Sequence, residues 1–276
     1  MDKFRGGKLM KNRSIKLATV TAMGFLVLIF SSMNLWAEDE AKPSASGDVG
    51  VFSQYIWRGY EFSKDSIVIQ PSATVSYKDV SFNLWGNLDT DLYTDPNGES
   101  QFTETDMTLS YDKSFGMVSL GAGYIYYGLD GMDDSQEIYL SIGLDTLLSP
   151  SLTVYREISN YQGWYISLGV SHSFELPKEI TLDLGGSIGY YAYDDVYEFD
   201  DNGNETTDKY SALHNGLISV GLTIPIGKYF SVVPMVAYSF PLSNEADNMI
   251  TYTNLSAGFE DKSDFFYGGV TASLSF

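Results

Sequence analysis

The residues of this sequence best suited to chemistry are acidic side chains that recur at alternate positions of extended segments. The acids that share the predicted inward-facing phase are Asp89, Glu104, Asp106, Asp112, Glu137, Asp145 and Asp183. The rest of that phase is mostly Gly and Ser. Acidic side chains around a wet passage favour cations. The alternative is that these acids are hydrated, or pair with Arg58 and Arg156 and so brace the interior. The candidates for lining a passage are Arg58, Asp89, Glu104, Asp106, Glu137, Asp145 and Asp183.

Catalytic combinations are poorly supported. The only histidines are His172 and His214, which lie near opposite ends of their predicted strands. Ser173 is adjacent to His172, but consecutive strand residues point to opposite faces. A membrane-barrel lipid hydrolase is therefore the weakest of the functional hypotheses. The sequence has no Cys, no phosphate-binding Gly loop and no His/Cys metal set, so we predict no enzyme, cofactor or metal.

Residues 194–209 form the most acidic stretch, DDVYEFDDNGNETTDK. Asp200, Asn202 and Asn204 have the spacing of the first ligands of a calcium-binding loop. That loop requires Gly at its sixth position and Glu at its twelfth, where this sequence has Glu205 and Ser211. We interpret the stretch as a solvated surface loop, with a loose cation site that bridges to lipopolysaccharide phosphates as the alternative.

Alternation of apolar and polar residues predicts the elements that position these side chains. A period of two is the pattern of a half-buried strand, and segments of about 10–12 residues fit a tilted transmembrane strand. The predicted strands lie near 48–58, 67–78, 80–90, 102–112, 116–127, 136–147, 151–158, 162–174, 180–193, 212–225, 229–240 and 265–276.

The connections alternate between short and long, which is the pattern of an outer-membrane barrel. The short ones are 78–79, 113–115, 148–150, 175–179 and 226–228. The others are 59–66, 91–101, 128–135, 159–161, 194–211 and 241–264. The last contains another candidate strand near 249–259, which we treat as part of a loop that could fold inward as a plug. An even strand count places both termini on the periplasmic side.

A soluble β-sandwich or lipocalin-like barrel also alternates, but its apolar outer face would be left in water. Aromatic residues at both ends of the apolar phase favour a bilayer, whose two interfaces select such belts. At the turn ends these are Tyr77, Tyr111, Phe174, Phe230 and Phe276. At the loop ends they are Trp57, Tyr126, Trp164, Tyr190, Phe240 and Phe266. The predicted fold is an all-β, transmembrane, antiparallel up-and-down barrel of about twelve strands.

Both ends of the sequence carry targeting patterns. A basic stretch, the apolar run 17–30 and Ala37 before the acidic EDE predict a signal peptide over 1–37. The run is too short for a membrane helix, which needs about 20 residues; an uncleaved anchor is the alternative, and Met10 is a second candidate start. A polar periplasmic leader then covers 38–47 and the barrel 48–276. The final strand ends on Phe276, which we interpret as the signal read by the barrel-assembly machinery.

The charge balance excludes one class of partner. The chain has 16 Lys and Arg against 36 Asp and Glu, a net charge of −20. Phosphate backbones are bound by basic surfaces, so no nucleic acid partner is predicted.

The stretch from Ser53 to Asp91 resembles the start of the TorF family of outer-membrane porins. The matching features are a Tyr-x-x-Arg-Gly strand end, a Pro in the second strand, and Trp-Gly before Asn and Asp in the third. They stand here as Tyr55, Arg58, Gly59, Pro71, Trp85, Asn87 and Asp89. The chain departs from the family pattern at Tyr60-Glu61-Phe62, where a small aliphatic residue and Ser are more usual. The resemblance implies a barrel in the outer membrane and a porin-like role.

The sequence thus predicts an outer-membrane channel for passive diffusion of small hydrophilic solutes or ions, biased toward cations. The rival hypothesis is a non-conducting structural or adhesive barrel whose acidic loops bind cations. The expected partners are outer-membrane lipid and lipopolysaccharide, the assembly machinery, and small solutes or cations.

Overall fold

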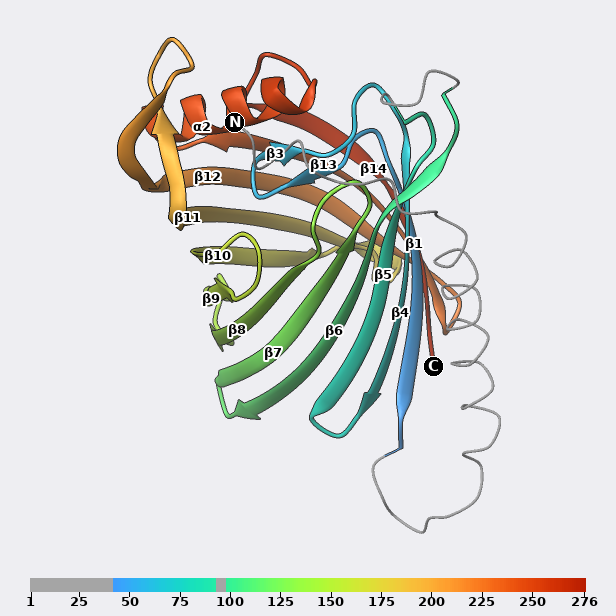
Figure 1. Ribbon diagram of the computed structural model, residues 1–276. Coiled ribbons are helices and arrows are strands. Elements are labelled where there is room, and N and C mark those ends of the chain that lie inside the picture. Colours follow the sequence, from blue (N-terminus) through green and yellow to red (C-terminus); the bar gives the residue numbers. More distant parts are fainter. Residues whose placement is uncertain (1–41, 93–97) are drawn as a thin grey trace. The chain divides into compact units, whose positions relative to one another are not determined.

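Twelve antiparallel strands close on themselves to form a barrel in the computed structural model, which describes residues 42–92 and 98–276. Strand β1, drawn in blue in Figure 1, pairs with β14, drawn in red, on one side and with β4 on the other. The wall strands are β1 (Ser44–Phe52), β4 (Val68–Tyr77), β5 (Val80–Asp89), β6 (Gln101–Phe115), β7 (Val118–Leu129), β8 (Ser135–Leu144), β9 (Ser151–Glu157), β10 (Gly163–Glu175), β11 (Thr181–Phe199), β12 (Glu205–Ile226), β13 (Phe230–Pro241) and β14 (Phe265–Ser275). The predicted fold class is confirmed.

The alternation of side chains sets the two faces of this wall. Large apolar residues such as Leu109, Leu140 and Ile218 point outward and are more than half exposed. Gly, Ser and acidic residues occupy the opposite phase. An apolar exterior around a polar interior is the arrangement of a barrel that crosses a bilayer. Within the described residues, no helix is long and apolar enough to cross a membrane.

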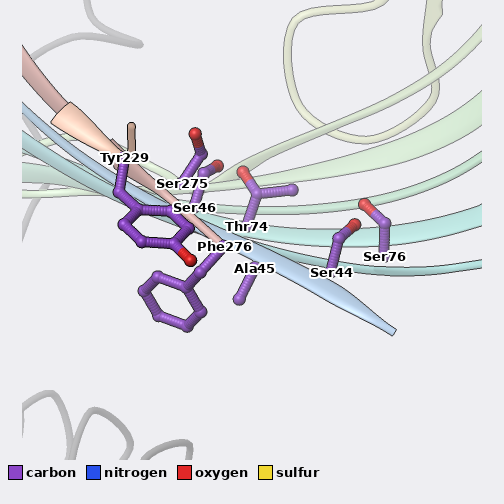
Figure 2. A pocket seen from close by; sticks show the side chains of 8 residues that line it. All are labelled: Ser44, Ala45, Ser46, Thr74, Ser76, Tyr229, Ser275 and Phe276. Carbon is purple, nitrogen blue, oxygen red and sulfur yellow. The ribbon is translucent and has the colours of Figure 1, made fainter. Parts of the chain in front are cut away.

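The two ends of the barrel differ in their connections. We call the end with the short connections 78–79, 116–117, 145–150, 176–180 and 227–229 the turn end, and the opposite end the loop end. Both ends of the described wall meet at the turn end, where Ala45 and Phe276 exchange two backbone hydrogen bonds of 3.0 Å. A pocket lies there, and Figure 2 shows the residues that line it: Ser44, Ala45, Ser46, Thr74, Ser76, Tyr229, Ser275 and Phe276.

Two segments outside the predicted strands belong to the wall. β1 begins at Ser44, so residues 44–47, predicted as periplasmic leader, pair with β4 and β14. β11 and β12 extend through most of the loop predicted over 194–211, leaving a turn at 200–204. The backbone N–H groups of Asn204 and Asn202 donate to Asp200 in this turn, and they hold the pKa of Asp200 below its usual range. The signal peptide predicted over 1–37 lies outside the described residues, as do residues 38–41 of the leader.

The candidate strand near 249–259 is wrong, because this segment belongs to the helix α2 (Asn244–Ala257). The Ser243 hydroxyl caps its first turn by accepting from the Ala246 N–H at 3.1 Å. Gly258, with φ of 88°, ends it, and the Phe259 N–H returns to the Asn254 carbonyl at 2.9 Å. The helix lies at the loop end, in the connection between β13 and β14 (Figure 1).

Candidate functional site

A short hairpin interrupts the connection from β1 to β4 and inserts into the lumen at the loop end. It consists of β2 (Ile56–Trp57) and β3 (Tyr60–Glu61), joined by Arg58 and Gly59. Both joining residues have positive φ, 49° and 88°, as a tight two-residue hairpin turn requires. We call residues 56–61 the lumen hairpin. The wall strand predicted over 48–58 therefore ends at Phe52, and Trp57 lies in the hairpin and not in an interfacial belt.

Gly59 is required by both its conformation and its surroundings. A Cβ at this position would lie 3.0 Å from Ile250 Cδ1 and 3.2 Å from Asn215 Cβ. Such distances are tight, and φ of 88° disfavours any side chain there. The Gly of the Arg-Gly pair thus lets the hairpin tip pass between β12 and α2.

Arg58 anchors the hairpin tip to the wall through Glu137 of β8. Arg58 Nη1 and Nη2 donate to Glu137 Oε1 and Oε2 at 2.6 and 2.8 Å. The two side chains are only 8% and 3% exposed. Tyr127 of β7 also donates to Glu137 Oε2, at 2.8 Å. A bidentate Arg–carboxylate pair fixes geometry as well as charge, so this contact determines where the tip lies.

Aromatic rings surround the same guanidinium. Arg58 Cζ lies 4.2 Å from the ring centroid of Tyr165, 4.6 Å from that of Tyr155 and 5.9 Å from that of Tyr191. The ring of its neighbour Trp57 is 4.3 Å away. Cation–π attraction operates within about 6 Å and is strongest where water is excluded. We call Glu137, Tyr155, Tyr165 and Tyr191 the cation pocket.

The tyrosines of the pocket belong to a row that crosses four adjacent strands. Tyr139, Tyr155, Tyr165 and Tyr191 occupy directly opposed positions on β8, β9, β10 and β11. Neighbouring ring centroids are 5.5, 6.0 and 5.3 Å apart, within the range of favourable aromatic pairs. The Tyr165 hydroxyl is fixed by Asn215 at 2.9 Å. The barrel wall thus supplies this aromatic surface independently of the hairpin.

Two further residues of the pattern that resembles the TorF family, Tyr55 and Trp85, pack below the hairpin. Tyr55 is buried against Trp85, with ring centroids 5.6 Å apart, and its side chain hydrogen-bonds Glu104. Glu104 in turn contacts Asp106, its neighbour on the inward face of β6. Trp85 is therefore an interior residue, and the motif residues Tyr55, Arg58, Gly59 and Trp85 all serve to seat one insertion.

Helix α2 covers the hairpin from the loop side. Its Met249 and Ile250 are buried in one cluster with Tyr60 and the pocket tyrosines. Glu61, 2% exposed, donates its N–H to Asn254 at 3.2 Å. Its carboxylate accepts from Gln54 at 2.6 Å and from the Glu260 N–H at 3.4 Å. Burial raises the pKa of Glu61. Loop 241–264 thus holds the inserted hairpin in place, while the charged group inside the cation pocket is Arg58 of the hairpin.

Exposure of the interior changes along the barrel. At the loop end, Asn87, Asp89, Glu137 and His214 are at most 2% exposed. Towards the turn end, the same inward phase is accessible. Its exposed members there include Asp112, Ser114, Ser171 and Ser173. The lumen is therefore filled by side chains around the hairpin and opens toward the turn end.

The candidate acids other than Asp145 fall into three groups. Glu104, Asp106 and Glu137 come together around Tyr55, Tyr127 and the hairpin. Asp89 lies at the loop end, where Ser66 donates to one of its oxygens and the other has no hydrogen-bond partner. Asp183 lies toward the turn end and accepts from Ser173, Thr181 and Thr223.

Two of the charged residues lie off the lumen. Asp145 is exposed in the turn after β8, because the strand ends at Leu144. Arg156 points outward from β9, makes a bidentate pair with Asp194 at 2.6 and 3.0 Å, and lies 5.1 Å from the ring of Trp164. The interior bracing thus involves Arg58 and not Arg156.

The histidines do not form a catalytic arrangement with Ser173. His172 contacts the Leu147 carbonyl at 2.6 Å on the outer face near the turn end, whereas Ser173 donates inward to Asp183. His214 is fully buried near the hairpin, and its Nδ1 lies 2.5 Å from the hydroxyl oxygen of Tyr210. Among residues 42–92 and 98–276, no group of three or more His, Asp and Glu side chains is arranged to hold a metal ion.

Sequence reasoning missed the tyrosine row. Tyr139, Tyr155, Tyr165 and Tyr191 share the inward phase of consecutive strands, so the alternation alone contained a signal for them. Their direct opposition depends on strand register, which alternation does not fix. Glu157, 3% exposed, was also missed; it accepts from Ser135, Ser159 and the N–H of Tyr161 and so secures the β9–β10 connection.

These features define a closed β-barrel of the outer-membrane type with an inserted hairpin. No protein-family model matches the chain, and no curated protein sequence is significantly similar to it. The similarity to the TorF family therefore stays a prediction.

Similar solved structures are other barrels. The transport unit of the autotransporter AIDA-I from Escherichia coli has 13% identity and a TM-score of 0.38, over 93% of this chain and 98% of that chain. The translocator domain of NalP from Neisseria meningitidis has 10% identity and a TM-score of 0.38, over 95% and 98%. An anion-selective porin from Comamonas acidovorans has 10% identity and a TM-score of 0.32, over 87% and 100%. Scores this low carry no argument about function.

Proposed function

We propose that this protein is an outer-membrane channel for passive diffusion of small hydrophilic solutes or ions, biased toward cations, whose passage is narrowed by the lumen hairpin. The observation that carries the proposal is the combination of a polar lumen, accessible from the turn end, with one inserted hairpin at the loop end. The lumen hairpin would narrow the lumen at the loop end, while the turn-end part of the lumen stays accessible.

The proposed cation bias comes from acids that no described base neutralises by an ion pair. Arg58 neutralises Glu137, whereas Glu104 hydrogen-bonds Asp106, so these two carboxyl groups share a proton and together carry the remaining negative charge. These two carboxyl groups lie beside Tyr55, next to the lumen hairpin that would narrow the passage. Acidic side chains at a constriction favour cations over anions.

Single-channel recording in a planar bilayer tests the function. The wild type should show steady conductance and, in a salt gradient, a reversal potential of the sign expected for cation preference. Replacing Glu104 with Gln and Asp106 with Asn should move that potential toward zero, and ~1 M salt should weaken the preference, because the Debye length is then about 3 Å.

Asp145→Asn is the matched control, because Asp145 lies in an exposed turn and should leave the reversal potential unchanged. A wild-type potential of zero would overturn the cation bias. An absence of conductance in both the wild type and a hairpin variant would favour the rival structural or adhesive barrel, for which the filled loop end is the supporting observation.

The proposed location and partners follow from the two surfaces. The exposed apolar exterior would contact outer-membrane lipid, and the acidic loop end would face lipopolysaccharide and its bound cations. The strand that ends at Phe276 would be read by the assembly machinery. A non-enzymatic role is part of the same proposal.

A further inference from the structure

We propose that the cation pocket is a binding site for organic cations with a guanidinium or small alkylammonium head, and that Arg58 occupies it as an internal ligand. The proposal rests on the proposed channel function in one respect: the organic cation would be a solute that passes through the channel. Binding of the cation to the pocket does not itself require conduction. In this view, the hairpin and the solute compete for one site.

The pocket belongs to the barrel wall, and its ligand belongs to the insertion. Glu137, Tyr155, Tyr165 and Tyr191 come from four adjacent strands, β8 to β11. Tyr127 holds Glu137 from β7, and Asn215 holds Tyr165 from β12. The positions of Glu137 and Tyr165 are therefore set by wall residues and not by the hairpin.

The composition of the pocket selects an organic cation over a metal ion. Three aromatic faces and one carboxylate surround the charge. Hard cations such as Ca²⁺ and Mg²⁺ require six or more oxygen ligands. A planar guanidinium instead uses the two carboxylate oxygens for parallel hydrogen bonds and offers its faces to the rings. The bidentate distances of 2.6 and 2.8 Å show that Glu137 is already positioned for such a head.

The hairpin is attached in a way that allows exchange. Its own ladder contains only two residue pairs, Ile56–Glu61 and Trp57–Tyr60. Its other contacts include Trp57 with Tyr127 on β7, Tyr60 with Tyr193 on β11 and His214 on β12, and Glu61 with α2. Among these contacts, the ion pair of Arg58 with Glu137 is the one that a solute cation could replace.

The test uses Arg58→Ala in the full chain, refolded in detergent, with methylguanidinium as the probe. Removing the side chain opens a cavity shaped for the probe. Isothermal titration calorimetry should show binding to R58A at least about tenfold tighter than to the wild type, whose pocket is filled. Adding Glu137→Gln to R58A should weaken binding at least about tenfold, because the bidentate ionic contact is lost.

Arg156→Ala is the matched control. It also removes a bidentate arginine, but from the outer face, where a carboxylate and a single Trp ring flank the charge. R156A should bind no better than the wild type. Equal binding by R58A and R156A, or binding unaffected by E137Q, would overturn the inference. If R58A does not fold alone, methylguanidinium should restore its folded, heat-modifiable band, and failure to do so would also overturn it.

Conductance separates this inference from the proposed function. Methylguanidinium should block current through R58A at concentrations that leave R156A current unchanged. Binding to R58A without any current would support the pocket and overturn the channel. Current without binding would support the channel and overturn the pocket.

Discussion

The loop-end and turn-end halves of the lumen are built from the same strands but differ in what fills them. Near the loop end, a guanidinium is enclosed by tyrosines and its ion pair is almost fully buried. Near the turn end, inward positions carry Gly, Ser and accessible acids. The ion pair at that end, Lys113–Asp79, lies outside the lumen beside the β4–β5 turn and is 43% and 35% exposed. In both halves, outward apolar residues alternate with inward residues along each strand. The difference therefore comes from the insertion of residues 56–61 and from the tyrosines that receive it.

The two ion pairs give the sharpest test of this comparison. Arg58→Ala leaves the Glu137 carboxylate buried without its cation, which should lower the free energy of unfolding by about 3–5 kcal/mol. Lys113→Ala at the turn end should produce no measurable change, because its pair is solvated. Urea unfolding of the refolded barrel, followed by tryptophan fluorescence, measures both.

The double variant Arg58→Ala with Glu137→Gln refines the result. It also removes the buried, unpaired charge of Glu137 and should therefore be less destabilised than R58A alone. The effects of substitutions at two residues in contact do not add. If R58A and K113A had equal effects, the pair at the hairpin tip would not be energetically distinct and the comparison would fail.

Glycines provide a second, smaller contrast. Gly59 and Gly227 have similar φ values of 88° and 73°, but a Cβ on Gly227 in the β12–β13 turn would meet nothing within 4 Å. Gly227→Ala should therefore cost only the strain of a left-handed backbone, about 1–2 kcal/mol. Gly59→Ala adds crowding against Ile250 and Asn215 and should cost about 1–3 kcal/mol more. Unfolding curves measured in parallel would show this difference, and equal costs would mean that the tip is not tightly held.

The wall could be predicted from the sequence because bilayer contact imposes one local rule on every strand. Leu, Ile and Val on one phase and Gly or Ser on the other are enough to identify residues such as 162–174 as a spanning strand. The rule did not identify residues 194–199 of β11 and 205–211 of β12 as strand. Those residues are rich in Asp, Asn and Glu, so the apolar phase fades although hydrogen-bonded pairing continues.

The hairpin could not be predicted by the same rule. Tyr55 and Trp57 continue the alternation of β1, so the local pattern is the same whether the chain follows the wall or enters the lumen. The decisive contact joins Arg58 to Glu137, 79 residues later, and depends on the barrel already being closed. For α2, Thr251, Tyr252 and Thr253 favour a strand locally, while the overlooked signals were the caps at Ser243 and Gly258.

The smallest expected effect concerns pH and the contact between the hairpin and α2. Burial raises the pKa of Glu61 above its usual value of 4.5, so the charged form is disfavoured in the docked state. Protonation therefore stabilises docking at low pH, and this contribution is lost as the pH rises through the raised pKa. Lys262 and the hydrogen bonds from Gln54 and Glu260 partly offset the cost of the charge.

Glu61→Gln imitates the protonated carboxyl and provides the measurement. Its stability advantage over the wild type should be near zero at about pH 4 and should grow toward pH 7.5, as shown by urea unfolding at each pH. The conductance of the wild type should fall on acidification, because the hairpin is held more firmly, while that of E61Q should vary less. An advantage of E61Q that is constant with pH would show that the carboxyl charge does not oppose docking. The connection between the hairpin and α2 would then rest on the Asn254 and apolar contacts alone.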